Sequence, residues 1–283
     1  MNEVHIGNLG MRGAVHSLCS AWGGRVWMGA WRRSDSNADP IRSNGRSVAS
    51  HHKEAGHPAG RKPLRKQLFV ILCMLVLSGV AARAQDETWD TVSIPGICTY
   101  QIPSTLELQK GTYKKINDQL RKSVLEIETT PDRVVAQPKG INDFDPVALK
   151  RYCRVIVETE RGSRGEYAKL DEPMALSAAE LKELETEIKS QLQQRAALLT
   201  SKGIKMTILS WQGVKITRVN GVDALLTTYT RSINDAPSVL VRMYKIQNND
   251  CLHTITISYR ESESNLWEAD LEKVVGTFKF KKR

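Results

Sequence analysis

The sequence predicts one exported domain of the α/β (α+β) class, an antiparallel β-sheet covered by helices. Three observations lead to this prediction. Residues 205–260 alternate apolar and polar side chains with period two and are interrupted by short turns, which is typical of antiparallel strands. After Ser177, leucines and isoleucines recur at helical spacing. A secretory signal-peptide pattern ends at Ala84, which leaves residues 85–283 as a single domain with a full core.

The leader, residues 61–84, has the three parts of a signal peptide. Its basic start is followed by an apolar run over 68–80 and by small residues at Ala82 and Ala84, the order that a signal peptidase needs. We therefore expect cleavage between Ala84 and Gln85. The alternative is an uncleaved membrane anchor, but the apolar run is shorter than the roughly 20 residues that a spanning helix needs. We expect no stable membrane span after cleavage.

Residues 1–60 precede this leader. They are rich in Arg, Gly, Ser, His and Trp and show neither helical nor strand periodicity, so they cannot bury enough apolar surface to order and we expect disorder. Two explanations compete: a long basic region of the signal peptide, or an upstream stretch that the gene model includes and the cell does not translate. We favour the second, because nothing in this segment is needed by a signal peptide.

The net charge of +10 suggests nucleic-acid binding until the chain is divided at the cleavage site. Residues 1–84 hold 12 Lys/Arg and 4 Asp/Glu, which leaves a nearly balanced 29 and 27 for residues 85–283. Five of the six histidines also precede the cleavage site, and only His253 follows it. We therefore predict no nucleic-acid partner and no zinc site built from several histidines.

The domain begins with extended segments. Residues 94–109 predict two short strands around a turn at Pro103, with Cys98, Tyr100 and Ile102 on one face.

Further strands are expected over 124–128 and 152–158, and turn-forming residues between them predict a long loop over 130–147. In the second strand Cys153 and Val155 share a face with Val157, so Cys153 should point into the core.

A polar loop over 161–176 precedes the clearest local signal, the capping box at Ser177 and Glu180. The serine hydroxyl accepts from the backbone N–H of Glu180, and the glutamate carboxylate accepts from that of Ser177. Because the apolar stripe that follows is one-sided, this helix should cover a sheet and end at Gly203. The stripe consists of Leu181, Leu184, Ile188, Leu192 and Leu199.

The period-two region resolves into four strands that should form an antiparallel meander. A helix over 264–275 follows, burying Leu266 or Trp267, and residues 277–281 alternate as a closing strand. The four expected strands are 206–218, 222–231, 238–247 and 251–260.

This order of elements resembles the PsbP-like and DcrB-like α-β-α sandwich domains. The resemblance rests on residues 100–105, residues 219–224, and Trp267 with residues 278–280, and it covers most of 94–281. It implies an α-β-α sandwich. Because the family includes extrinsic photosystem subunits and bacterial envelope proteins, it also implies a binding or assembly role. Metal ligands of some photosystem relatives have no match here, so the resemblance assigns none.

Cys251 and His253 are the one nucleophile-plus-base pair in the domain. Residues two apart on a strand project to the same side, about 6–7 Å apart, so a thiol–imidazole contact is conceivable. We favour the simpler explanation that both are core residues beneath a helix, since Ile255 continues the same face. Whether any two of Cys98, Cys153 and Cys251 form a disulfide stays open; we favour three buried thiols.

Residues 141–146 offer the carboxylates of Asp143 and Asp145, with Asp171 and Glu172 in the next loop, but they form only part of a calcium-binding set. Phe144, apolar and flanked by charge, is either a contact for a partner or a side chain tucked over the sheet edge.

The residues and motifs of the domain favour a binding protein over an enzyme. The domain has one histidine, and its sequence contains neither a phosphate-binding loop motif nor a nucleophile-elbow motif. We therefore predict an exported, non-catalytic binding or envelope-assembly protein, periplasmic or extracellular, with a protein or small-molecule partner in the envelope. The sequence assigns no catalytic residue, cofactor or metal. The alternative is a thiol- or hydrolase-type enzyme that uses Cys251 and His253.

Overall fold

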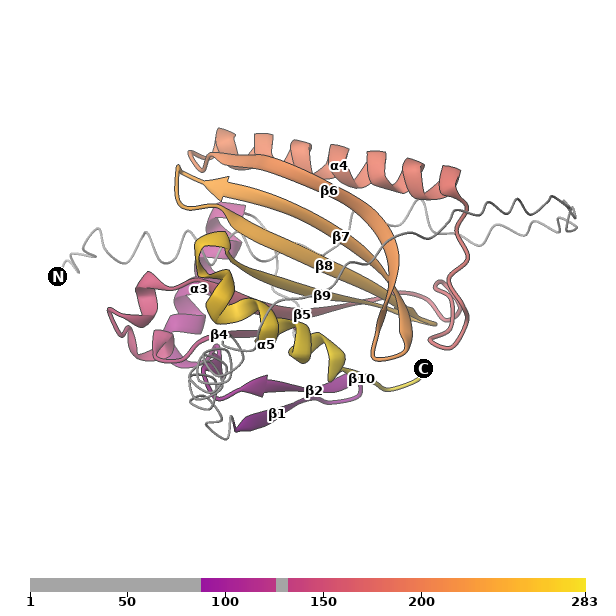
Figure 1. Ribbon diagram of the computed structural model, residues 1–283, viewed down its shortest axis with the longest axis horizontal. Helices are drawn as coiled ribbons and strands as arrows, with labels where there is room; N and C mark the ends of the chain where they lie inside the picture. Colours follow the sequence, from indigo (N-terminus) through magenta and orange to yellow (C-terminus); the bar gives the residue numbers. More distant parts are fainter. Residues whose placement is uncertain (1–87, 126–131) are drawn as a thin grey trace, which may run out of the picture. The chain divides into compact units, whose positions relative to one another are not determined.

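The computed structural model describes residues 88–125 and 132–283 (Figure 1). The expected extension over 1–60 and the signal peptide over 61–84 lie outside the described residues, and so does the cleavage site.

Within the described residues the larger sheet has seven strands, and every neighbouring pair is antiparallel. The strand order is β3-β4-β5-β9-β8-β7-β6, so the expected four-strand meander is confirmed (Figure 1). A tight turn with positive φ at both Asn220 and Gly221 joins β6 to β7, as the Asn-Gly pair favours. The strands are β3 (Leu106–Leu108), β4 (Val134–Pro138), β5 (Cys153–Arg161), β6 (Met206–Val219), β7 (Val222–Ile233), β8 (Val239–Asn248) and β9 (Cys251–Arg260).

A smaller sheet holds the first strand and the last strand of the described chain. Cys98, Tyr100 and Ile102 of its middle strand are all buried, as their shared face predicts. The closing strand does not join the meander. It pairs with this middle strand, and the rings of Tyr100 and Phe278 stack with centroids 4.4 Å apart. The strands are β1 (Trp89–Ile94), β2 (Cys98–Pro103) and β10 (Lys279–Phe280), in the order β1-β2-β10.

Helix α4 (Ala178–Ser201) lies along one face of the larger sheet (Figure 1). Both hydrogen bonds of the expected capping box are present: the Glu180 N–H donates to Ser177 Oγ at 3.2 Å, and the Ser177 N–H donates to Glu180 Oε2 at 2.7 Å. The predicted stripe faces the sheet, where Leu184, Ile188 and Leu192 pack against residues of β7 and β8.

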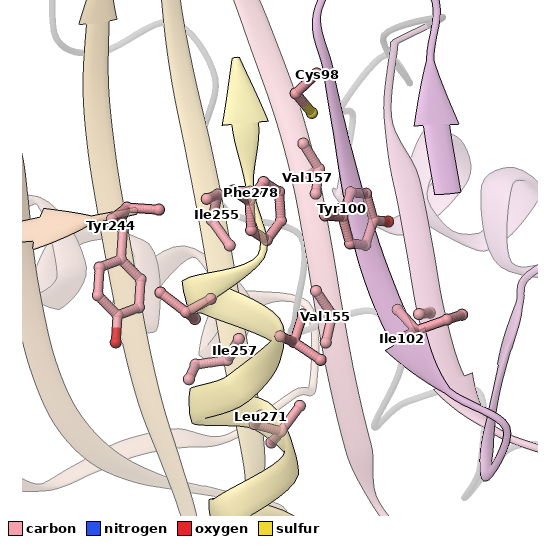
Figure 2. Close-up of a cluster of buried hydrophobic side chains, with 14 of the residues drawn as sticks. Cys98, Tyr100, Ile102, Val155, Val157, Tyr244, Ile255, Ile257, Leu271 and Phe278 are labelled. Carbon is pink, nitrogen blue, oxygen red and sulfur yellow. The ribbon is translucent and has the colours of Figure 1, made fainter. Parts of the chain in front are cut away.

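Helix α5 (Ser264–Gly276) lies on the opposite face, where Leu271 packs in one cluster with Ile255 and Ile257 of β9 (Figure 2). Side chains of β8 alternate between the two faces, so that Val241 packs in the cluster under α4 and Tyr244 packs in the cluster under α5. Trp267 is buried there with Leu271, whereas Leu266 is exposed. The expected sheet with helical covers is therefore confirmed as a helix–sheet–helix arrangement.

Helix α3 (Gly111–Leu125) corrects the sequence prediction. The expected strand over 124–128 is wrong where the structure describes it, because residues 124 and 125 are the end of this helix. The buried side of α3 carries Tyr113, Asn117, Leu120 and Arg121. Two of these four are polar, which hides the helical period from a search for apolar residues.

The predicted loop over 130–147 is also wrong in part, because it contains strand β4. Its turn-forming residues flank a five-residue strand that pairs with β3 on one side and β5 on the other. Gln137 points inward in this strand and is fully buried. Its amide oxygen accepts from the Gln109 side chain at 2.8 Å, which is how a polar residue is accommodated in the core.

Candidate functional site

The structure places Cys251 and His253 at the start of β9, both inaccessible to solvent. Asn248 Nδ2, a donor, lies 3.0 Å from His253 Nε2, and Thr159 Oγ1 lies 3.0 Å from Nδ1. The imidazole is therefore neutral, accepting at Nε2 and donating from Nδ1. Phe280 stacks on the ring with centroids 5.2 Å apart. Burial, followed by the charges of two arginines, lowers the pKa of His253 from 6.5 to about 4.

Neither residue of this pair is prepared for catalysis. Both ring nitrogens of His253 are engaged by other partners. Burial is the main cause that raises the pKa of the Cys251 thiol, and a reactive cysteine needs the opposite shift and an accessible sulfur. Cys98 and Cys153 are likewise buried free thiols. The geometry thus favours the interpretation of Cys251 and His253 as core residues over the alternative that they are catalytic.

Charged side chains form a buried layer between α3 and the sheet, which the sequence interpretation missed. Glu158 of β5 accepts from Arg133 Nε at 2.9 Å, and its Oε1 lies 3.7 Å from Arg121 Nη2 of α3. Arg121 is only 2% exposed, and burial lowers its pKa to about 10. Arg154 lies on the same face of β5 as Glu158, four positions earlier in the strand. Its guanidinium donates to the Tyr113 hydroxyl at 3.4 Å.

This charged layer connects elements rather than presenting a reactive group. A buried carboxylate shared by two arginines holds α3 against β5, and each charge depends on the others because desolvation is costly. One signal of it was available in the sequence. Arg154 and Glu158 occupy alternate positions of β5 that face the interior, where a half-buried strand would carry polar residues only on its outer face.

Phe144 lies on the exposed segment between β4 and β5 and is 43% exposed. Its backbone has a φ of 57°, the left-handed region, where a bulky residue is an outlier. Hydrogen bonds on both sides impose this conformation: Phe144 N–H donates to Ile141 O at 3.1 Å and Asp145 N–H donates to Gly140 O at 3.0 Å. The ring is only partly tucked against the domain, since it meets Tyr113 edge-on, with centroids 5.7 Å apart. Its contact with a partner stays a prediction.

The surroundings of Phe144 are apolar and basic. Val147, three residues along, is 62% exposed. Four exposed cations lie on this segment or at the adjoining start of α3, and none of them forms an ion pair within the part of the chain that the structure describes. We call this set the Phe144 surface; it comprises Phe144, Val147, Lys110, Lys139, Lys150 and Arg151.

Three of the four carboxylates that suggested calcium, those of Asp145, Asp171 and Glu172, are engaged elsewhere. Asp145 Oδ1 accepts from the Val147 N–H at 2.7 Å and the Ala148 N–H at 3.4 Å, and Asp171 pairs with Lys282 at 3.1 Å. The two loops do not form one concave site, because 139–151 precedes β5 and 162–176 follows its far end. Across residues 88–125 and 132–283 no group of three or more His, Cys, Asp or Glu side chains could hold a metal ion.

The described helices include none that is both long and apolar enough to cross a membrane.

Comparison with known proteins gives distant structural similarity. No protein-family model and no curated protein matches the chain. The structure is similar to the solution structure of cyanobacterial PsbP from Synechocystis sp. PCC 6803, at 10% identity and a TM-score of 0.39, over 71% of this chain and 97% of that one.

Two further solved structures are similar at still lower scores. One is a protein from Bacteroides thetaiotaomicron, at 7% identity and a TM-score of 0.33, over 66% of this chain and 46% of that one. The other is a protein of unknown function from Pseudomonas aeruginosa, at 9% identity and a TM-score of 0.28, over 67% and 94% of the two chains. At these values the similarities concern the fold and carry no functional argument.

Proposed function

We propose that the chain is an exported, non-catalytic binding or envelope-assembly protein and that it binds its partner through the Phe144 surface. The observation that carries this proposal is the strained and exposed position of Phe144, at a φ of 57° and 43% exposure. A left-handed backbone costs a non-glycine residue about 1–2 kcal/mol. Outliers of this kind cluster at binding and switch sites, where the side chain is needed in one direction.

The rest of the segment supports this surface as a rigid platform. Ile141 and Ala148 are buried on either side of Phe144 and pack with Tyr113 of α3. Gly140 has a φ of 96°, and a Cβ there would lie 3.2 Å from Asp145 Cβ and 3.3 Å from Ala148 Cβ, so the close turn requires glycine. A surface that is ordered before binding loses little conformational entropy when its partner arrives.

The experiment compares the purified exported protein with two variants on envelope fractions of the expressing cell. Phe144→Ser should weaken retention of the protein by about ten-fold, because burial of a phenylalanine contributes roughly 1.5–3 kcal/mol. Leu209→Ser, on an exposed leucine of β6, is the matched control and should bind like the wild type. Equal retention of all three proteins would contradict the proposal.

Export is a separate part of the proposal and has its own test. It is supported by the basic stretch, apolar run and small residues of 61–84. N-terminal sequencing of the exported protein should begin at or beside Gln85, since a signal peptidase cleaves after the small-residue pair. A product that begins at Met1 would refute export by this route.

A further inference from the structure

We propose that the partner of the Phe144 surface is an anionic phospholipid bilayer, with Phe144 and Val147 entering the interfacial region and the surrounding cations contacting headgroups. This inference rests on the proposed function, because it takes the same surface as the binding surface and names what binds there. It concerns a protein lying on a bilayer, and it requires no helix that crosses one.

The apolar side chains are few and protrude. Phe144 and Val147 stand on a segment whose ends are fixed by buried residues, and they are 43% and 62% exposed. The other exposed large apolar side chains are single residues on separate elements: Ile116 on α3, Leu198 on α4, Leu209 on β6 and Leu266 on α5. Single exposed apolar residues are ordinary, whereas a pair on one rigid segment is a candidate for insertion.

The charges around the pair favour an anionic surface. Lys110, Lys139, Lys150 and Arg151 are exposed, against the two exposed carboxylates of Asp143 and Asp145 on the same segment. The Lys110 N–H donates to Asn142 Oδ1 at 3.1 Å, which places the start of α3 beside this segment. Each cation near an anionic leaflet raises affinity by about five-fold. The attraction of the four cations therefore outweighs the repulsion between the leaflet and the two carboxylates.

A bilayer suits this small apolar and basic surface better than a protein partner does. A stable protein interface needs about 1,000 Å² or more of buried surface with a depleted charge density at its core. Two exposed apolar side chains on a segment with four exposed cations, none of which forms an ion pair among the described residues, suit a bilayer instead. There the small apolar side chains enter the headgroup region and electrostatic attraction supplies the remaining binding energy. An acidic protein is the rival occupant, and the experiment separates the two.

The test is flotation of the purified exported protein with vesicles of phosphatidylcholine, with or without phosphatidylglycerol. We expect at least about ten-fold stronger binding to the phosphatidylglycerol vesicles and loss of this preference when the ionic strength is raised. The double variant Phe144→Ser/Val147→Ser should bind about ten-fold more weakly, and so should Lys150→Glu/Arg151→Glu. Leu209→Ser should float like the wild type. Circular dichroism melting of each variant confirms that it is folded.

Two outcomes overturn the inference. The first is absence of binding to phosphatidylglycerol vesicles, and the second is equal binding to vesicles with and without this lipid. A parallel arm uses envelope proteins freed of lipid. Binding there that depends on Phe144, without vesicle binding, overturns the lipid assignment and leaves the proposed function standing. Failure in both arms refutes both proposals.

Discussion

Burial of a neutral His253 makes the folded protein sensitive to acid. In the folded state the imidazole is held between Thr159 and Asn248, and its pKa falls from 6.5 to about 4. When the chain unfolds, the imidazole regains its ordinary pKa and binds a proton more readily than the folded state does. Stability is therefore fully present above the unfolded pKa and is lost as the pH falls from 6.5 toward 4.

The magnitude follows from the two pKa values. A difference of one unit corresponds to about 1.4 kcal/mol, so the displacement of His253 lowers the free energy of unfolding by about 3 kcal/mol between neutral pH and about pH 4. Carboxylates contribute in the same direction, because hydrogen bonds lower the pKa values of Asp171, Glu180 and Asp223. The imidazole must therefore be isolated by comparison with a variant.

The assay is urea unfolding of the wild type and His253→Gln across this pH range. Glutamine keeps a donor and an acceptor and does not titrate, so the wild type should lose about 3 kcal/mol more than the variant on acidification. Parallel pH profiles of the two proteins would contradict the assignment of this loss to His253. An NMR titration of the His253 ring in the folded wild type gives an independent reading. A pKa near 6.5 would contradict the burial argument, and a pKa near 4 would support it.

Three further predictions concern other elements. Glu158→Gln should lower the free energy of unfolding by about 3–5 kcal/mol in urea melts, because Arg121 and Arg133 then remain buried without their counter-charge; a loss below about 1 kcal/mol would show that the layer is hydrated. Ser177→Ala should cost about 1 kcal/mol and Ser177→Gly only a few tenths, measured in the same way, and equal losses would argue against the capping box. Phe144→Gly should be more stable than Phe144→Ala by about 1 kcal/mol in thermal melts, since only glycine relieves the positive φ, and the reverse order would contradict the strained backbone.

The meander and helix α4 could be predicted from sequence because each depends on local periodicity and on end signals. The four strands alternate with period two between turns. The capping box joins Ser177 to Glu180, three residues later, and α4 begins directly after Ser177. The faces of β2 and β5 were also predictable. Cys98 and Cys153 lie in the core, as the alternation of their strands requires.

Helix α3 and strand β4 could not be predicted, because their stability comes from distant partners. Arg121 is accommodated through Glu158, and Gln137 through Gln109. Such residues look like surface positions in a linear chain, since a polar side chain is buried only when a partner is supplied from elsewhere.

The candidate site was predicted only in part, for the same reason. The shared face of Cys251 and His253 follows from strand geometry, whereas the partners of the imidazole come from β5 and the end of β8. The sequence left Phe144 with two alternatives because its neighbours are turn-forming residues without periodicity. The positive φ of this residue follows from the hydrogen bonds that the N–H groups of Phe144 and Asp145 donate, and the segment is held by the packing of Ile141 and Ala148 against Tyr113.

The most direct test of the Phe144 surface is photo-crosslinking in the living cell. A photoreactive phenylalanine analogue replaces Phe144 in one strain and Leu209 in another, and both strains are irradiated. Both positions are exposed, but the proposed function places only position 144 against a partner. We expect a crosslinked envelope adduct at position 144 and none at position 209. Adducts of equal yield at both positions, or none at position 144, would contradict it.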